Sequence, residues 1–162
     1  MTKLKNTQIE LMHIKLELDN GRTQHFRSFI DQYYCYKNGY VTRTGRAKWT
    51  ALFWKEIVSK NAKQITDQKL VVKEHVVPLK VITHKLQKLA ENNTTTLPTI
   101  QSVLDRYTLF ATITKKEDKL LREAKLSSEM PIEFYNTDDP LYNDVFARYK
   151  KVGIEYEILL GG

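Results

Sequence analysis

Residues 69–90 read KLVVKEHVVPLKVITHKLQKLA and join the two kinds of secondary structure expected in this chain. The first part, Lys69 to Val77, is rich in β-branched residues, which fit extended backbone, so it predicts a short strand. Pro78 suits the first turn of a helix, where its missing N–H costs no hydrogen bond. From Leu79 to Ala90 apolar residues recur at helical spacing. This stretch therefore predicts an α+β fold.

Two helices are expected before this stretch. Residues 8–18 place apolar side chains on one helical face, but they also alternate as a strand does, so a strand ending in an Asn-Gly turn is the alternative. The scarcity of β-branched residues favours the helix, and Thr7-x-x-Glu10 predicts a capping box at its start. Residues 26–34 carry apolar side chains at helical spacing, and Asn38-Gly39 fits either a helix cap or a hairpin turn.

The other elements are expected from similar signals. Thr114-x-x-Glu117 repeats the capping-box pattern and predicts another helix start. Further expected elements are a helix over 45–61, a short helix opened by Pro98, a strand over 108–113, a last helix from about Pro140 to Gly153 and a strand over 154–159. The sequence thus predicts an α-dominated α+β fold, with six to seven short helices packed around one core and two or three short strands. Residues 1–162 are expected to form a single domain.

Composition indicates the class of protein. Of the 162 residues, 41% are apolar, enough for a core, and no apolar run is long enough to cross a bilayer. Cys35 is the only cysteine, so no disulfide can form within one chain. With no secretory signal recognised near Met1, these features predict a cytoplasmic protein without a membrane partner.

The distribution of charge is more informative. The formal net charge is +7. Residues 1–126 hold 23 Lys and Arg against 12 Asp and Glu, a net of +11, whereas residues 127–162 hold 3 against 7, a net of −4. Such a split indicates a basic face that seeks a polyanion or an acidic protein partner, although a lysine-rich solvated surface would give the same numbers.

Residues 36–49 are the first candidate site, because cations, aromatic rings and glycines crowd one connection there. Cations neutralise phosphates, rings stack on bases, and glycine lets the backbone approach a ligand. An ordinary exposed loop with packed aromatics is the alternative. The predicted nucleic-acid-binding residues, including an extension into the following helix, are Lys37, Tyr40, Arg43, Arg46, Lys48, Trp49, Lys80, Lys85 and Lys88.

The segment Glu74-His75-Val76-Val77-Pro78 is the second candidate. It resembles the acidic-His-x-x-Pro pattern of some His-Me-finger nucleases, in which the histidine is a general base and nearby groups hold a divalent metal. The resemblance implies Glu74 and His75 as catalytic residues and His75 with His84 as metal ligands. On a regular strand Glu74 and His75 point to opposite faces. The sequence departs from the family pattern in two ways, because Pro78 begins a helix where a second strand is expected and no Asn/His pair follows at helical spacing. A structural histidine is the alternative.

Three functions are compatible with these patterns. The leading expectation is a basic cytoplasmic binding protein without a cofactor, a regulator or inhibitor of the kind bacteria and phages deploy. It would engage nucleic acid or a nucleic-acid-handling protein. A metal-dependent nuclease at Glu74 and His75 is the alternative, and it alone would need a divalent metal. An immunity-type protein that binds an acidic protein partner is the third, and the oligomeric state is left open.

Overall fold

The computed structural model describes residues 2–159, and these residues divide into two compact units. The first unit comprises the described residues up to 51 together with residues 82–108, and the second comprises residues 52–81 together with the described residues from 109 onward. The chain passes between the units three times, once within a helix. The expectation that residues 1–162 form a single domain stays a prediction.

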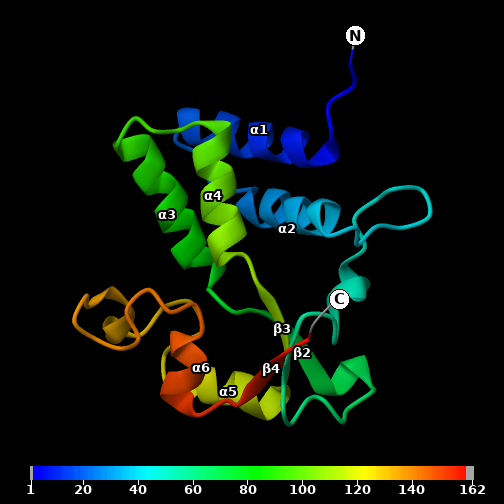
Figure 1. The fold of residues 1–162 in the computed structure, drawn as a ribbon, viewed down its shortest axis with the longest axis vertical. Helices are drawn as coiled ribbons and strands as arrows, with labels where there is room; N and C mark the ends of the chain where they lie inside the picture. The colour runs from blue at the N-terminus through cyan, green and yellow to red at the C-terminus, as the bar shows by residue number, and fades with distance from the viewer. Residues whose placement is uncertain (1, 160–162) are drawn as a thin grey trace. The chain divides into compact units, whose positions relative to one another are not determined.

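Helices build the first unit. They are α1 (Asn6–Asp19), α2 (Phe26–Lys37), most of α3 (Leu79–Glu91) and α4 (Leu97–Tyr107). Helix α1 packs against both α2 and α4, and Figure 1 shows α1 and α2, in blue, lying side by side. Apolar residues at helical spacing fill the core of this unit, among them Ile14, Phe26, Ile30, Ile82, Leu86, Ile100 and Leu104, each almost fully buried.

A four-stranded sheet with the order β2-β3-β1-β4 organises the second unit. Its strands are β1 (Ile57–Ser59), β2 (Val71–His75), β3 (Phe110–Thr114) and β4 (Tyr156–Ile158). Strand β3 pairs antiparallel with β2 and parallel with β1, and β1 pairs antiparallel with β4. The two central strands, β3 and β1, are therefore joined by pairing between residues more than fifty positions apart.

Side chains from both faces of the sheet are buried. On one face, Ile57, Ala111 and Ile113 pack with Leu121 of α5 (Lys115–Glu123) and Tyr149 of α6 (Ala147–Val152). On the other face, a smaller apolar cluster contains Val58, Val71 and Ala62. The short 3-10 helices η1 (Trp49–Leu52), η2 (Gln68–Leu70) and η3 (Ile132–Tyr135) lie in the connections.

The α-dominated α+β prediction is confirmed, and residues 2–159 contain six α-helices and four strands, where two or three strands were expected. Residues 8–18 are helical, as favoured, and do not form the alternative strand. Asn38-Gly39 caps the helix that precedes it, as expected, and Gly39 has a φ of +74°. In the described residues, no helix is both long and apolar enough to cross a bilayer.

Two sequence predictions fail at particular elements. The expected helix over residues 45–61 is absent. Its first residues form a hairpin, a 3-10 turn occupies Trp49–Leu52, and strand β1 takes Ile57–Ser59. Helical spacing of bulky residues was misleading here because a buried strand is also continuously apolar. The expected last helix is also shorter, because it begins only at Ala147.

Of the two capping boxes predicted from the sequence, the one at the start of α5 is confirmed and the one at the start of α1 is wrong. Thr114 caps α5 as predicted, since its Oγ1 accepts from the Glu117 amide at 3.1 Å and Glu117 Oε2 accepts from the Thr114 amide at 2.8 Å. Helix α1 begins one position before Thr7, and the carboxylate of Glu10 lies 3.3 Å from His13 Nδ1 instead of returning to the helix start. The same four-residue pattern can therefore satisfy different partners.

Candidate nucleic-acid interface

A small hairpin directly follows α2 and carries the centre of the predicted basic site. An isolated antiparallel bridge joins Val41 to Ala47. Inside it, the Thr42 amide donates to the Arg46 carbonyl at 2.7 Å and the Gly45 amide donates to the Thr42 carbonyl at 2.9 Å. Gly45 has a φ of +82°, a conformation that side chains other than glycine rarely adopt. The loop is therefore held in one conformation by its own backbone.

The side chain of Thr42 reinforces this turn. Its Oγ1 accepts from the Arg46 amide at 3.1 Å and lies 3.1 Å from the Thr44 hydroxyl. Several backbone N–H groups of the hairpin therefore donate within the hairpin itself, whereas in a flexible loop they would donate to water.

Contacts at its base attach the hairpin to α2. The Tyr40 amide donates to the Cys35 carbonyl at 2.9 Å, and the Lys48 amide donates to the Tyr40 carbonyl at 2.8 Å. The ring of Tyr40 stacks on Tyr34, with centroids 6.3 Å apart, and burial raises the pKa of Tyr40. Tyr40 and Trp49 are both half-buried, so each ring packs against the protein on one side.

Three cations of the hairpin are the most available of the predicted set. Arg43, Arg46 and Lys48 are exposed, and none has an ion-pair partner in the described part of the chain. By contrast, four other cations of the first unit are paired with carboxylates, Lys15 with Asp19, Arg22 with Glu17, Lys37 with Asp105 and Lys88 with Glu91, although Lys3, Lys5 and Arg27 are not paired within residues 2–159. Among the predicted binding residues of the first unit, the three hairpin cations therefore have charges that no nearby carboxylate of the described residues neutralises.

The other predicted binding residues have different environments. Lys37 lies 2.6 Å from the carboxylate of Asp105, which also accepts from the Tyr33 hydroxyl at 2.8 Å. The ammonium of Lys85 lies 4.3 Å from the centroid of the Tyr107 ring. In the second unit, Lys80 is 2.5 Å from Glu129. Each of these cations would have to leave a local partner before it met a phosphate.

The division into units also locates the positive charge. The first unit holds 12 Lys and Arg against 6 Asp and Glu, a net of +6, whereas the second holds 14 against 13, a net of +1. The +11 before residue 127 is divided almost evenly between the units, +6 in the first and +5 in the second. The −4 after residue 127 belongs to the second unit and offsets most of its excess, so the net positive charge of the chain resides mainly in the unit that contains the hairpin.

The second candidate site contains Glu74, whose carboxylate is engaged in hydrogen bonds with side chains of α6. Its carboxylate accepts from the Arg148 guanidinium and from the Tyr149 hydroxyl. Burial raises the pKa of Glu74, while the two donors oppose that shift. Burial and the nearby carboxylate raise the pKa of Tyr149 well above its ordinary value.

His75 lies next in β2 and takes different neighbours. Its ring centroid is 4.4 Å from that of Phe110, the residue opposite it on β3. His75 belongs to the second unit, whereas His84 is exposed on the part of α3 that belongs to the first. Within residues 2–159 no group of three His, Cys, Asp or Glu side chains is placed to hold a metal ion.

Two features of this site and network were not expected from the sequence. The hairpin has a recognisable signal, since β-branched Val41 and Thr42 precede a glycine that can turn the chain at Gly45. Arg148, which is fully buried, has no such signal. In the sequence it resembles the basic residues Lys150 and Lys151, which follow it and are exposed.

No protein-family model, curated protein or solved structure matches this chain.

Proposed function

We propose that the protein binds nucleic acid through the hairpin at residues 40–48, with Arg43, Arg46 and Lys48 contacting phosphates. The observation that carries the proposal is that these three cations are exposed, have no ion-pair partner among the described residues, and lie on a turn fixed by its own hydrogen bonds. A fixed loop loses less conformational entropy on binding than a flexible one, so more of the electrostatic gain remains.

The chemistry of the hairpin suits backbone contacts more than base readout. Arginine donates to phosphate oxygens through a planar fork, and the hydroxyl of Thr44 offers a further donor at the exposed tip. Tyr40 begins the hairpin and Trp49 follows it, and both side chains are half-buried. The proposal therefore predicts affinity with little dependence on sequence and a strong dependence on salt.

The direct test is fluorescence anisotropy with a labelled DNA duplex and a labelled single-stranded RNA, over roughly 50 to 200 mM salt. The wild-type dissociation constant should rise steeply with salt. Arg43→Ala combined with Arg46→Ala should weaken binding and reduce the slope of log affinity against log salt by roughly 2 on duplex DNA, about 0.9 for each phosphate that is no longer neutralised.

A matched control removes the same charge elsewhere. Lys115 and Lys116 are exposed at the start of α5, and no ion pair involves them within residues 2–159. Lys115→Ala with Lys116→Ala should leave the slope close to that of the wild type. Equal effects of the two double variants would show that only net charge matters and would contradict a hairpin site. Binding to neither probe would remove nucleic acid as the ligand.

The other two functions stay predictions. A nuclease at Glu74 and His75 would lose cleavage on addition of EDTA and in His75→Ala. An immunity-type protein would form a stoichiometric complex with an acidic protein and have no affinity for the labelled probes.

A further inference from the structure

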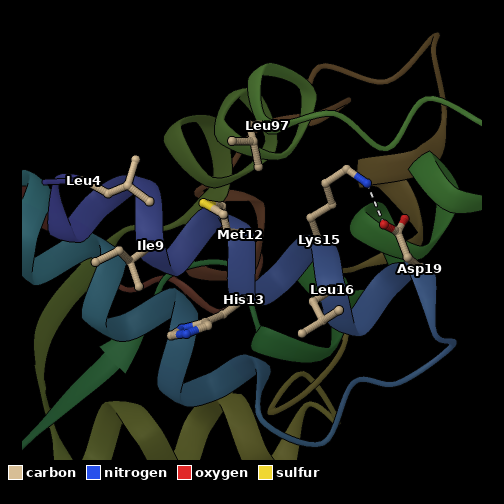
Figure 2. A pocket seen from close by; sticks show the side chains of 8 residues that line it. All are labelled: Leu4, Ile9, Met12, His13, Lys15, Leu16, Asp19 and Leu97. Atoms are coloured by element: carbon tan, nitrogen blue, oxygen red, sulfur yellow. Dashed lines mark hydrogen bonds and ion pairs between the residues drawn. The ribbon is translucent and has the colours of Figure 1, made fainter. Parts of the chain in front are cut away.

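The first unit has an apolar groove along α1, but nothing in the structure shows what covers it. Figure 2 shows Met12 of α1 and Leu97 of α4 in its lining, and Lys15 paired with Asp19 beside them at 2.5 Å. Since these two charges satisfy each other within α1, they select no partner. A pocket in the second unit has a more definite chemistry, because its wall includes an aromatic ring that hydrogen bonds fix in place.

This pocket lies next to the smaller apolar cluster of the second unit, the one that contains Val58. Its volume is about 430 Å³, and small-molecule sites typically measure roughly 300 to 1,000 Å³. Apolar side chains and two polar ones line it: Trp54, Val58, Ile65 and Leu159, with Lys63 and Thr66. All of them belong to the second unit, so the pocket does not depend on how the two units are arranged.

Trp54 has a backbone conformation that tryptophan rarely adopts. Its φ is +56°, in the left-handed region that glycine and asparagine enter more easily. Such strain persists only where the surroundings enforce it, and it is concentrated at functional sites. The Trp54 amide donates to the Thr112 hydroxyl oxygen at 2.8 Å, and the indole N–H donates to the Ala62 carbonyl at 3.0 Å. These two hydrogen bonds hold the indole in one position at the pocket wall.

The fixed indole limits the contacts that a ligand can make with it. Its single polar group, the Nε1–H, already donates to Ala62, so the surface that remains for a ligand is the aromatic ring itself. Aromatic rings attract other aromatic rings beyond the area that they bury together. A planar aromatic ligand is therefore favoured over an aliphatic one of the same size.

The polar residues of the pocket favour a ligand without net charge. The ammonium of Lys63 lies 2.6 Å from the carboxylate of Glu157 on β4, so its charge is already balanced. An ammonium nevertheless carries three N–H donors, and the hydroxyl of Thr66 can both donate and accept. These two side chains can therefore hydrogen-bond a neutral polar group, whereas a charged ligand would compete with one member of the pair and repel the other.

We infer that this pocket binds an uncharged planar heteroaromatic molecule, which stacks on Trp54 and places its polar group next to Lys63 and Thr66. The inference does not rest on nucleic-acid binding, because the pocket and the hairpin belong to different units and share no residue.

Titration of the isotope-labelled full chain, followed by NMR, tests this inference with matched probe compounds. The chain has two tryptophans, so the indole N–H of Trp54 is the reporter and that of Trp49 is the internal control. Nicotinamide should shift the Trp54 signal saturably and leave the Trp49 signal in place. Cyclohexanecarboxamide has the same amide without an aromatic ring and should bind roughly two- to tenfold more weakly. Nicotinate has the same ring with a negative charge and should also bind more weakly.

Variants locate the binding site, with binding measured from the NMR signals of the ligand. Trp54→Leu keeps an apolar side chain but removes the ring, so it should bind nicotinamide no better than cyclohexanecarboxamide. Thr66→Ala is a second variant at an exposed position, where folding is not at stake, and it should weaken binding of both amides by roughly two- to tenfold. The control is Tyr142→Leu, which removes a ring that is 49% exposed and outside the pocket. It should bind as the wild type does.

Several results would overturn the inference. They are no saturable shift of the Trp54 signal, an equal response to cyclohexanecarboxamide, tighter binding of nicotinate, and wild-type affinity in both Trp54→Leu and Thr66→Ala. Binding that appeared only in a chain shortened to end at Leu159 would also overturn it, because the end of the chain itself would then be the occupant.

Discussion

The guanidinium of Arg148 is completely buried and donates to the carboxylate of Glu74, 74 positions earlier in the chain. The same guanidinium also donates to the carbonyls of His75 at 2.5 Å, Val76 at 2.8 Å and Leu126 at 2.7 Å. One side chain thereby links α6 to the end of β2 and to Leu126 in the connection after α5. A buried cation is tolerated only when it is paired and its donors are satisfied, as they are here.

Arg148→Met should lower the free energy of unfolding by about 3 to 5 kcal/mol, because it leaves Glu74 charged and buried without its counter-ion. Urea denaturation measures this loss. Adding Glu74→Leu to Arg148→Met should recover part of it, since no unpaired charge then remains. The matched control is Arg122→Met on α5, where the pair with Asp118 is exposed. It should cost no more than about 1 kcal/mol. A similar loss in both variants would contradict a special role for burial.

Lys125→Gly should stabilise the fold by roughly 0.5 to 1 kcal/mol. Lys125 follows α5 with a left-handed φ of +60°, and its amide donates to the Arg122 carbonyl at 3.0 Å. The Leu126 amide donates to the Leu121 carbonyl at 2.8 Å, which completes a helix end that favours glycine. Thermal unfolding should show a higher midpoint for Lys125→Gly and a lower one for Lys119→Gly, which places glycine within the helix. A lower midpoint in both would contradict the assignment.

Glu10→Gln should raise stability at pH 7 but not at pH 4. Burial raises the pKa of Glu10 in the folded chain, although His13 opposes the shift. The folded state then holds this proton to a higher pH than the unfolded state, so stability is lost as the pH rises through the folded pKa. Glutamine removes the ionisation and hence the loss. Denaturation at both pH values measures the difference, and Glu91→Gln, at an exposed carboxylate, is the control. An advantage that is equal at pH 4 and pH 7 would contradict this account.

Much of the secondary structure was predictable because its signals are local. Pro78 and the apolar spacing after it identified α3, and the Thr114–Glu117 pair identified α5. Arg43 and Arg46 could be singled out from the sequence because clustered charge is visible there, and their role in binding stays a prediction. That they have no ion-pair partner within residues 2–159 was not predictable, since ion pairing depends on residues that folding brings near.

What the sequence did not indicate depends on distant contacts. Strand β1 is three residues long and pairs with β3 and β4, so nothing beside it in the chain marks it as a strand. Arg148 was missed because a basic residue in a basic helix looks solvated until its partners are known. The sequence placed apolar side chains on one face of α1 but could not indicate that Met12 and Leu16 are exposed, since spacing identifies an apolar stripe without saying whether the fold covers it.

The sheet order has a consequence for how the chain acquires its structure during synthesis. Every helix of the first unit precedes residue 109, whereas strand β1, made early, obtains its partner β4 only when residues 156–158 emerge. Until then one side of β1 offers unpaired backbone groups, which are a template for aggregation. A nascent chain that is truncated shortly before β4 would therefore contain all helices of the first unit, but the edge of β1 that pairs with β4 would remain without a partner strand and prone to aggregation.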